Sequence, residues 1–105
     1  LNSTNPDYWN IKGNAFYVLG KYDEAFKAYD QAIKLNLTNP VYWNNKGYAL
    51  SYLKRYNESI YPYDQAIKLN SSEPVYWNNK GYALKFLGRT TEANAAFTMA
   101  KELEV

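Results

Sequence analysis

The chain has 105 residues, a net charge of +2 from twelve Lys and Arg and ten Asp and Glu, and neither Cys nor His. Without cysteine there are no disulfides or thiolate ligands, and without histidine there is no Ser-His catalysis and no common zinc site. The small basic excess does not indicate a polyanionic partner. No apolar run approaches the roughly 20 residues that cross a bilayer, and the start of the chain shows no secretory signal. We therefore expect a cytoplasmic protein that makes no membrane contact.

The sequence repeats itself every 34 residues, at a period typical of stacked helical units. An eleven-residue stretch, PVYWNNKGYAL, occurs at 40–50 and again at 74–84. An eight-residue stretch, YDQAIKLN, occurs at 29–36 and again at 63–70. The first copy is looser and the third diverges after residue 90. We expect a single repeat domain over 1–105 with three copies, at 6–39, 40–73 and 74–105.

Each copy predicts two helices joined by a short turn. Apolar and aromatic residues recur at helical spacing twice in each copy. Turn residues separate the two stretches, and Pro40 and Pro74 disfavour helix at the residue before them, which closes each unit. No segment has the alternation of a strand. The expected helices, in chain order, are 7–19, 22–36, 41–53, 56–70, 75–87 and 90–103.

Aromatic and glycine residues recur at fixed offsets within the copies. The first copy carries Trp9, Gly13, Phe16, Ala25 and Tyr29. The equivalent residues of the other copies are Trp43, Gly47, Leu50, Ser59 and Tyr63, and then Trp77, Gly81, Leu84, Ala93 and Phe97. This pattern resembles the tetratricopeptide repeat, except that Lys replaces the Leu that the family has before the glycine. The resemblance implies an all-α fold, a right-handed solenoid of three antiparallel helix hairpins.

A glycine inside a helix lowers its stability by about 0.5–1 kcal/mol relative to Ala. Because Gly13, Gly47 and Gly81 recur at one helical position, we expect the partner helix to approach closely there, with small residues such as Ala25 and Ala66 opposite. Pro62 falls within the second helix of the second copy, where it removes one backbone hydrogen bond. We expect a local kink or widened turn near residues 58–62.

The sequence offers no candidate for catalysis, for a cofactor or for a metal. Its five glycines are isolated, so no loop is built to surround a phosphate. Neighbouring carboxylates such as Asp23 and Glu24 point to different sides of a helix. Metal binding lacks the usual His and Cys ligands. We expect a protein that is not an enzyme and that binds no cofactor and no metal.

The resemblance implies that the first helix of each copy lines a concave groove that holds an extended peptide. Asn amides both donate and accept hydrogen bonds, which suits a peptide backbone, and Tyr offers a large contact area with a polar tip. On a helical wheel such residues lie away from the Trp-Gly stripe. The candidate groove residues are Asn10, Asn14, Tyr17, Asn44, Asn45, Tyr48, Tyr52, Asn78, Asn79, Tyr82, Lys85 and Phe86.

Some members of the family hold the C-terminal carboxylate of a chaperone in a clamp of Lys, Asn, Asn, Lys and Arg. The matching residues here are Asn10, Asn14, Asn45, Val75 and Asn79. Both Asn match, but the three cations are missing, and with them the charge-assisted hydrogen bonds to a carboxylate. We therefore expect no chaperone clamp. Since Asp7 and Lys85 are the only charges of the predicted groove, a polar or mildly apolar segment is the expected ligand.

Together these observations predict a non-catalytic interaction scaffold whose partner is a protein or peptide. One alternative is a purely structural module that spaces or oligomerises a larger protein. Another is single-stranded RNA binding, because aromatic and Asn side chains can stack on and pair with bases. The 34-residue period and the small basic excess argue against RNA. We expect no nucleic-acid partner.

The last helix predicts an interaction of its own. It carries Ala93, Phe97, Ala100 and Leu103 at helical spacing, and no further helix follows to cover them. Repeat arrays need terminal units with a polar outer face. We therefore expect the chain to associate with itself through this uncapped C-terminal end.

Overall fold

The computed structural model describes residues 3–105, which form six helices and no strand. Residues 1 and 2, part of the stretch in which we found no secretory signal, lie outside the described residues. The predicted helix bounds are met to within one residue. The helices are α1 (Pro6–Val18), α2 (Tyr22–Leu35), α3 (Pro40–Tyr52), α4 (Tyr56–Leu69), α5 (Pro74–Phe86) and α6 (Thr90–Leu103).

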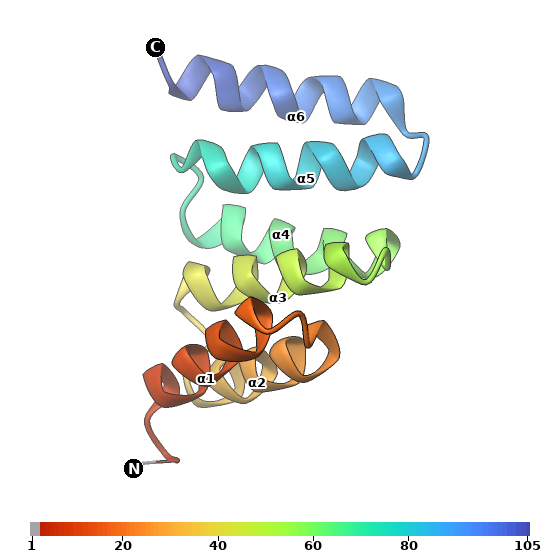
Figure 1. Cartoon of the computed structure of the whole chain (residues 1–105). Coiled ribbons are helices and arrows are strands. Elements are labelled where there is room, and N and C mark those ends of the chain that lie inside the picture. The colour runs from red at the N-terminus through yellow and green to blue at the C-terminus, as the bar shows by residue number, and fades with distance from the viewer. Residues whose placement is uncertain (1–2) are drawn as a thin grey trace.

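The six helices stack as three hairpins along one axis (Figure 1). Helices α1 and α2, α3 and α4, and α5 and α6 pack within a hairpin, whereas α2 against α3 and α4 against α5 join neighbouring hairpins. The stack is elongated, with extents of 44 × 25 × 19 Å. The predicted all-α solenoid of helix hairpins is confirmed.

The prolines between copies begin helices rather than merely ending the previous unit. Pro40 is the first residue of α3, where its missing N–H has no partner to lose. The Asn39 side chain precedes it and accepts from the Val41 amide at 2.9 Å. Asn5 caps α1 in the same way, and Glu73 takes this place before α5. These caps fix where each hairpin starts.

Each hairpin turn ends its first helix with a residue in the left-handed region. Gly20 and Gly88 have φ of 77° and 80° there, but the equivalent residue of the second copy is Lys54, with φ of 61°. In all three turns the next residue donates its N–H to a carbonyl five residues back, for example Arg55 to Leu50 at 3.0 Å. This pattern is the Schellman motif, and it normally favours glycine.

The recurring glycines do mark a close approach, but an aromatic ring approaches them rather than alanines. A Cβ built on Gly47 would lie 2.7 Å from Cε1 of Tyr63, and one on Gly81 would lie 2.6 Å from Cε1 of Phe97. The alanines instead pack between hairpins: Ala25 of α2, for example, is fully buried against Ala49 of α3. The expected close approach at the glycines is therefore confirmed, but the expectation that alanines lie opposite them is wrong.

The lysine that departs from the family pattern joins neighbouring hairpins. Lys46 Nζ lies 2.7 Å from Asp30 Oδ1, and Lys80 Nζ lies 2.6 Å from Asp64 Oδ1. Each pair links the first helix of one copy to the second helix of the copy before it.

Helix α4 continues through Pro62, whose side chain is fully buried.

The predicted self-association stripe is not an exposed surface. Ala93 and Ala100 are 1% and 0% exposed, and the Phe97 ring packs over Gly81 of the same hairpin. Leu103 is half-buried. The expectation of an uncovered apolar stripe is wrong, because these residues form the inner face of α6 against α5.

Candidate peptide-binding groove

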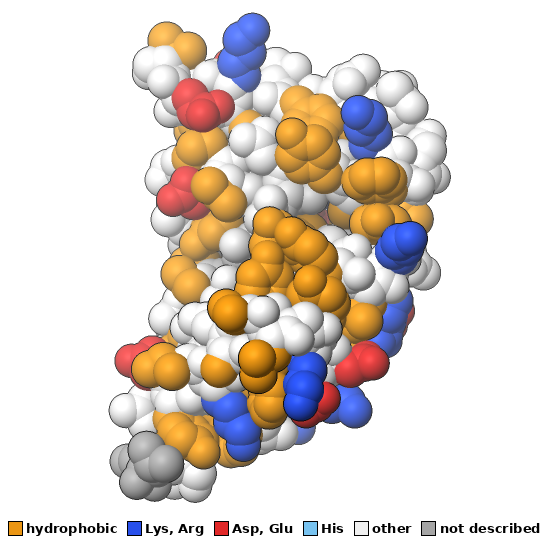
Figure 2. Space-filling view, viewed as in Figure 1, with side chains coloured by type: hydrophobic (Ala, Val, Ile, Leu, Met, Phe, Trp, Pro, Cys, Tyr) orange, Lys and Arg blue, Asp and Glu red, His pale blue; other side chains and the backbone are white. Residues whose placement is uncertain are grey.

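The face of α1, α3 and α5 that carries the predicted residues is called the groove face below. Figure 1 shows α1 in front of α2 and α3 in front of α4, so this face is turned toward the viewer for the first two hairpins. In the same view, Figure 2 shows hydrophobic side chains gathered in the middle of the molecule, with Lys and Arg side chains spaced along one edge.

Asn side chains of neighbouring copies hydrogen-bond each other along the groove face. Asn45 Nδ2 donates to Asn10 Oδ1 at 2.9 Å, and Asn79 Nδ2 donates to Asn44 Oδ1 at 2.9 Å. Each amide has two donors and an oxygen that can accept twice, so one such bond leaves capacity for a ligand. These residues therefore hold the first helices in register as well as presenting amides.

The first hairpin places its groove residues among tyrosines. Asn14 Oδ1 accepts from the Tyr29 hydroxyl at 2.6 Å. The Tyr17 ring centroid lies 5.7 Å from that of Tyr48 and 5.4 Å from that of Tyr52. The Tyr17 and Tyr48 hydroxyls, as hydrogen-bond partners of ionised Tyr52, lower the pKa of Tyr52. Burial raises the pKa of Tyr17, with a further increase from the neighbouring tyrosines.

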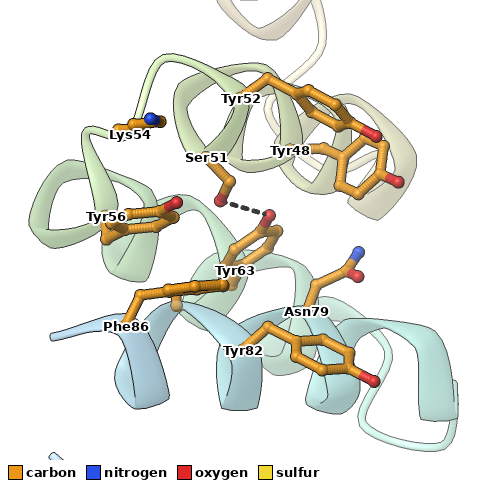
Figure 3. Close-up of a pocket in the computed structure, with 10 residues that line it drawn as sticks. Tyr48, Ser51, Tyr52, Lys54, Tyr56, Tyr63, Asn79, Tyr82 and Phe86 are labelled. Carbon is orange, nitrogen blue, oxygen red and sulfur yellow. Dashed lines mark hydrogen bonds between the residues drawn. The ribbon is translucent and has the colours of Figure 1, made fainter. Parts of the chain in front are cut away.

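A pocket of about 340 Å³ opens between α3 and α5 (Figure 3). Its lining is dominated by aromatic rings and holds a single charged side chain. Figure 3 shows α3 with its two tyrosines on one side and α5 on the other. The lining residues are Tyr48, Ser51, Tyr52, Lys54, Tyr56, Tyr63, Asn79, Tyr82, Ala83 and Phe86.

The pocket contains both a buried aromatic residue, Tyr63, and an exposed one, Phe86. Tyr63 forms its floor, is 1% exposed, and has its hydroxyl 3.0 Å from Ser51 Oγ. Burial raises the pKa of Tyr63 above its ordinary value. Phe86 is 65% exposed and stacks on Tyr56, with ring centroids 4.9 Å apart and planes inclined by 13°. An apolar surface this open is available to a ligand.

The pocket brings together five of the predicted groove residues: Tyr48, Tyr52, Asn79, Tyr82 and Phe86. The remaining predicted residues do not line the pocket, and those of α1 belong to the first hairpin, which contributes no lining residue. Five lining residues were not candidates. Ser51 lies on the same helix as Tyr48 and Tyr52, and the other four belong to the turn, to the second helix or to the buried stripe: Lys54, Tyr56, Tyr63 and Ala83. The concentration of Tyr in the second copy is a sequence signal that could have found Tyr56 and Tyr63.

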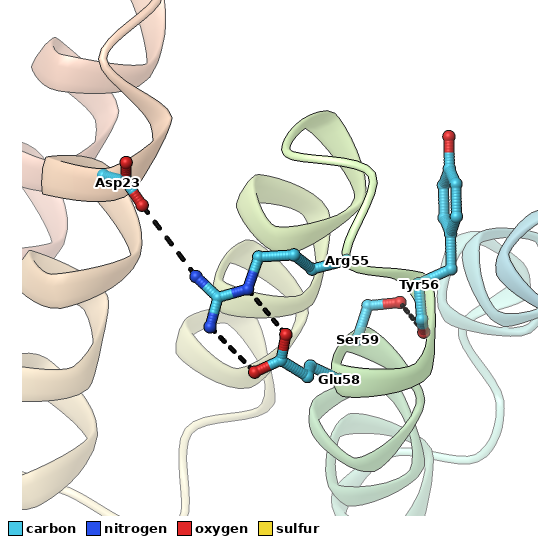
Figure 4. Close-up of polar contacts among 5 residues, drawn as sticks. All are labelled: Asp23, Arg55, Tyr56, Glu58 and Ser59. Carbon is cyan, nitrogen blue, oxygen red and sulfur yellow. Dashed lines mark hydrogen bonds and ion pairs between the residues drawn. The ribbon is translucent and has the colours of Figure 1, made fainter.

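Arg55, next to the pocket residue Lys54, is already paired. Arg55 Nε lies 2.6 Å from Glu58 Oε2, and its guanidinium also reaches toward Asp23 at 3.9 Å (Figure 4). Its hydrogen bonds to Glu58 raise the pKa of Arg55, and the same bonds to Arg55 lower the pKa of Glu58. Figure 4 also shows Ser59 Oγ donating to the Tyr56 carbonyl at 2.7 Å, which steadies the first turn of α4. Within residues 3–105 no ion pair involves Lys54 or Lys85.

Across the described part of the chain, no cluster of three acidic residues is arranged to hold a metal ion. Among residues 3–105 there is also no helix with the length and apolarity that a bilayer crossing demands.

Stacked hairpins with this helix geometry define the class, a helical-hairpin repeat protein. The family profile described as tetratricopeptide repeat matches residues 40–73 and 74–104, and a further profile, described as TPR repeat, matches residues 13–53. The chain belongs to the tetratricopeptide repeat family.

Solved structures of helical repeats are similar to this chain over nearly its whole length. The Arabidopsis OM64 TPR domain is 29% identical with a TM-score of 0.91, covering 94% of this chain and 82% of that one. The first TPR of Spaghetti (RPAP3), bound to the HSP90 peptide SRMEEVD, is 29% identical with a TM-score of 0.93, covering 99% and 82%. The second TPR of human RPAP3, in complex with the HSP70 peptide SGPTIEEVD, is 30% identical with a TM-score of 0.89, covering 95% and 87%. No curated protein matches the sequence.

Proposed function

We propose that this chain is a non-catalytic interaction scaffold that binds an extended peptide segment on the groove face. The observation that carries the proposal is the aromatic pocket between α3 and α5, open to solvent and continuous with a row of Asn amides. Tyr and Phe rings supply contact area with little loss of side-chain freedom, and Asn amides pair with a peptide backbone. Similar domains that were solved with bound peptides support this use of the fold.

The ligand differs in kind from the acidic chaperone tails in those complexes. The chain has Asn10, Val75 and Asn79 where the chaperone clamp has its cations. A terminal carboxylate at those positions has no charged partner to replace its hydration. We propose instead an internal segment of a partner protein.

A purely structural role is the second candidate, because the Asn–Asn bonds and the Lys–Asp pairs join neighbouring hairpins. Such a role accounts for the Asn row. It accounts for the stacking of Phe86 on Tyr56 of the neighbouring hairpin but not for the 65% of Phe86 that stays exposed. Peptide binding explains both.

Selection from a displayed library of random 15-residue peptides tests the proposal. Affinities of the selected peptides are measured on wild type and on two variants that each remove one exposed ring. Phe86→Ala empties part of the pocket, whereas Tyr61→Ala removes a 62% exposed ring of α4 that does not line it. Loss of affinity in Phe86→Ala alone supports the groove. Equal loss in both variants, or loss in Tyr61→Ala only, refutes it.

A further inference from the structure

The pocket between α3 and α5 has the size and lining for one large apolar side chain. Its volume of about 340 Å³ falls within the range of small ligand sites, which are mostly apolar with a few polar groups. Tyr63 closes the bottom, while Tyr82 and Phe86 remain more than half exposed at the rim. A bound Phe or Leu side chain would cover these rims and contact the buried floor.

Lys54 occupies a turn position at which the other two copies have glycine. Its φ of 61° lies in the left-handed region, where the equivalent residues are Gly20 and Gly88. A side chain there is strained and lowers stability relative to Gly. Nothing lies within 4 Å of a Cβ built on Gly20 or Gly88, so the turn itself requires no side chain. Retained strain of this kind marks a residue with a role outside the turn.

The charge of Lys54 has no partner in the described chain. Arg55 beside it is held by Glu58, and the Lys residues at the hairpin junctions are held by Asp30 and Asp64. No acidic residue lines the pocket. The pocket therefore combines aromatic walls with one unpaired positive charge at its edge, and its electrostatic complement is a carboxylate.

Resting on the proposed function, we propose that this pocket receives a Phe or Leu side chain of the bound segment, and that Lys54 pairs with the carboxylate of an Asp or Glu beside that side chain. Lys54 thus determines specificity within the groove. A cationic side chain would gain from the Tyr and Phe faces, but the ammonium group of Lys54 at the same pocket repels it.

Short synthetic peptides test the pairing. The peptides have nine residues of Gly and Ser around a central Phe, with an acetylated N-terminus and an amidated C-terminus. Each peptide carries a single Asp, placed one or two residues before the Phe or one or two residues after it. Their binding is followed by NMR titration of the isotopically labelled protein, against the Phe peptide without Asp, an Ala-Asp peptide and a Phe-Lys peptide. We expect one Phe-Asp peptide to bind at least about threefold more tightly than every control, as a partly exposed ion pair contributes up to about 1 kcal/mol.

Two variants of Lys54 separate its charge from its strain. Lys54→Met keeps a side chain in the left-handed turn and removes the charge, so the preference for Asp should vanish while the requirement for Phe remains. Lys54→Gly should do the same and also raise the melting temperature. Gly88→Lys, which puts the same strain in the third hairpin, should lower the melting temperature and leave the preference unchanged.

The inference is overturned if no Phe-Asp peptide exceeds its controls, if the Phe-Lys peptide binds best, or if the preference survives in Lys54→Met. Failure of the wider proposal has a different result. Peptides that shift the amides of Asn45 and Asn79 without any preference for Phe or Asp leave groove binding intact and refute only the pocket pairing. Loss of groove binding shows instead in the library selection, where Phe86→Ala and Tyr61→Ala behave alike.

Discussion

The packing of each hairpin rests on a glycine with no room for a methyl group. In Gly47→Ala the new Cβ would lie 2.7 Å from Cε1 and 2.8 Å from Cδ1 of Tyr63, well inside van der Waals contact. Tyr63 cannot swing aside into solvent, because it is 1% exposed and its hydroxyl is held 3.0 Å from Ser51 Oγ. The substitution must therefore push two helices apart or displace the ring.

The expected size of the effect follows from opposing contributions. Overpacking a well-filled core costs about 1–3 kcal/mol, and weakening the bond between Tyr63 and Ser51 adds about 1 kcal/mol. Ala gains up to about 1 kcal/mol over Gly in helix propensity. We expect Gly47→Ala to lower the free energy of unfolding by about 1–3 kcal/mol, and each kcal/mol lowers the melting temperature by about 4–8 °C.

Urea unfolding followed by circular dichroism measures the change, with Gly81→Ala as the matched comparison. Its ring partner, Phe97, is half-buried and has no hydroxyl bond to lose, so Gly81→Ala should cost less. A Gly47→Ala protein as stable as wild type would show that helix propensity outweighs the packing and would refute the reasoning.

Other outcomes follow from the same contacts. Pro62→Ala restores one helical hydrogen bond, worth about 3 kcal/mol in propensity, and removes about two buried CH₂ groups at about 0.8 kcal/mol each. It should raise the melting temperature, and an unchanged or lower value would contradict this. Phe97→Glu should unfold the last hairpin, seen as lost helical circular dichroism, because the carboxylate would lie against Gly81. Burial raises the pKa of Tyr29 to about 12. The unfolded chain then loses this proton first, so the urea midpoint should fall as pH rises from about 10 to 12, and less so in Tyr29→Phe.

The repeat period predicted the fold because it carries several consistent constraints at once. Helical spacing, turn residues and identical stretches 34 residues apart all indicate the same hairpin, and the helix bounds agree to within one residue. The sequence did not show which residue fills the space at Gly47, since either an Ala or an aromatic ring satisfies a helical wheel. Pro40 was also ambiguous, because a proline both ends one helix and begins the next.

The site was less predictable than the fold because it depends on contacts between copies. A wheel of one helix places Asn45 on the groove face but does not show its bond to Asn10, 35 residues away. Lys54 lies in a turn, outside any wheel, and only its backbone angle and its place beside the aromatic rings single it out. The tyrosines of the second copy are the sequence feature that could have indicated the pocket.

The outer face of α6 differs from those of the other second helices. In α2, three residues contact the next hairpin through stacking, ion–ring or core contacts: Tyr22, Phe26 and Ile33. The residues at the same positions of α6 are Thr90, Asn94 and Lys101, all exposed. The apolar residues that predicted self-association face inward instead. A polar outer face on the last hairpin removes the driving force for stacking another copy on it.

Restoring the internal pattern on α6 should therefore create head-to-tail association. At the opposite end of the stack, α1 exposes Ile11 by 66% and Val18 by 81%, an apolar face of the kind that receives a second helix. We expect Asn94→Phe/Lys101→Ile to associate head to tail with rising concentration, since such a contact does not close on itself. Sedimentation equilibrium should show a monomer for wild type and larger species for the variant. Adding Ile11→Asp/Val18→Asp to the variant should return it to the monomer, because the contact would then bury two unpaired carboxylates. Association of wild type at the same concentrations, abolished by Ile11→Asp/Val18→Asp, would show that the polar face of α6 does not act as a cap.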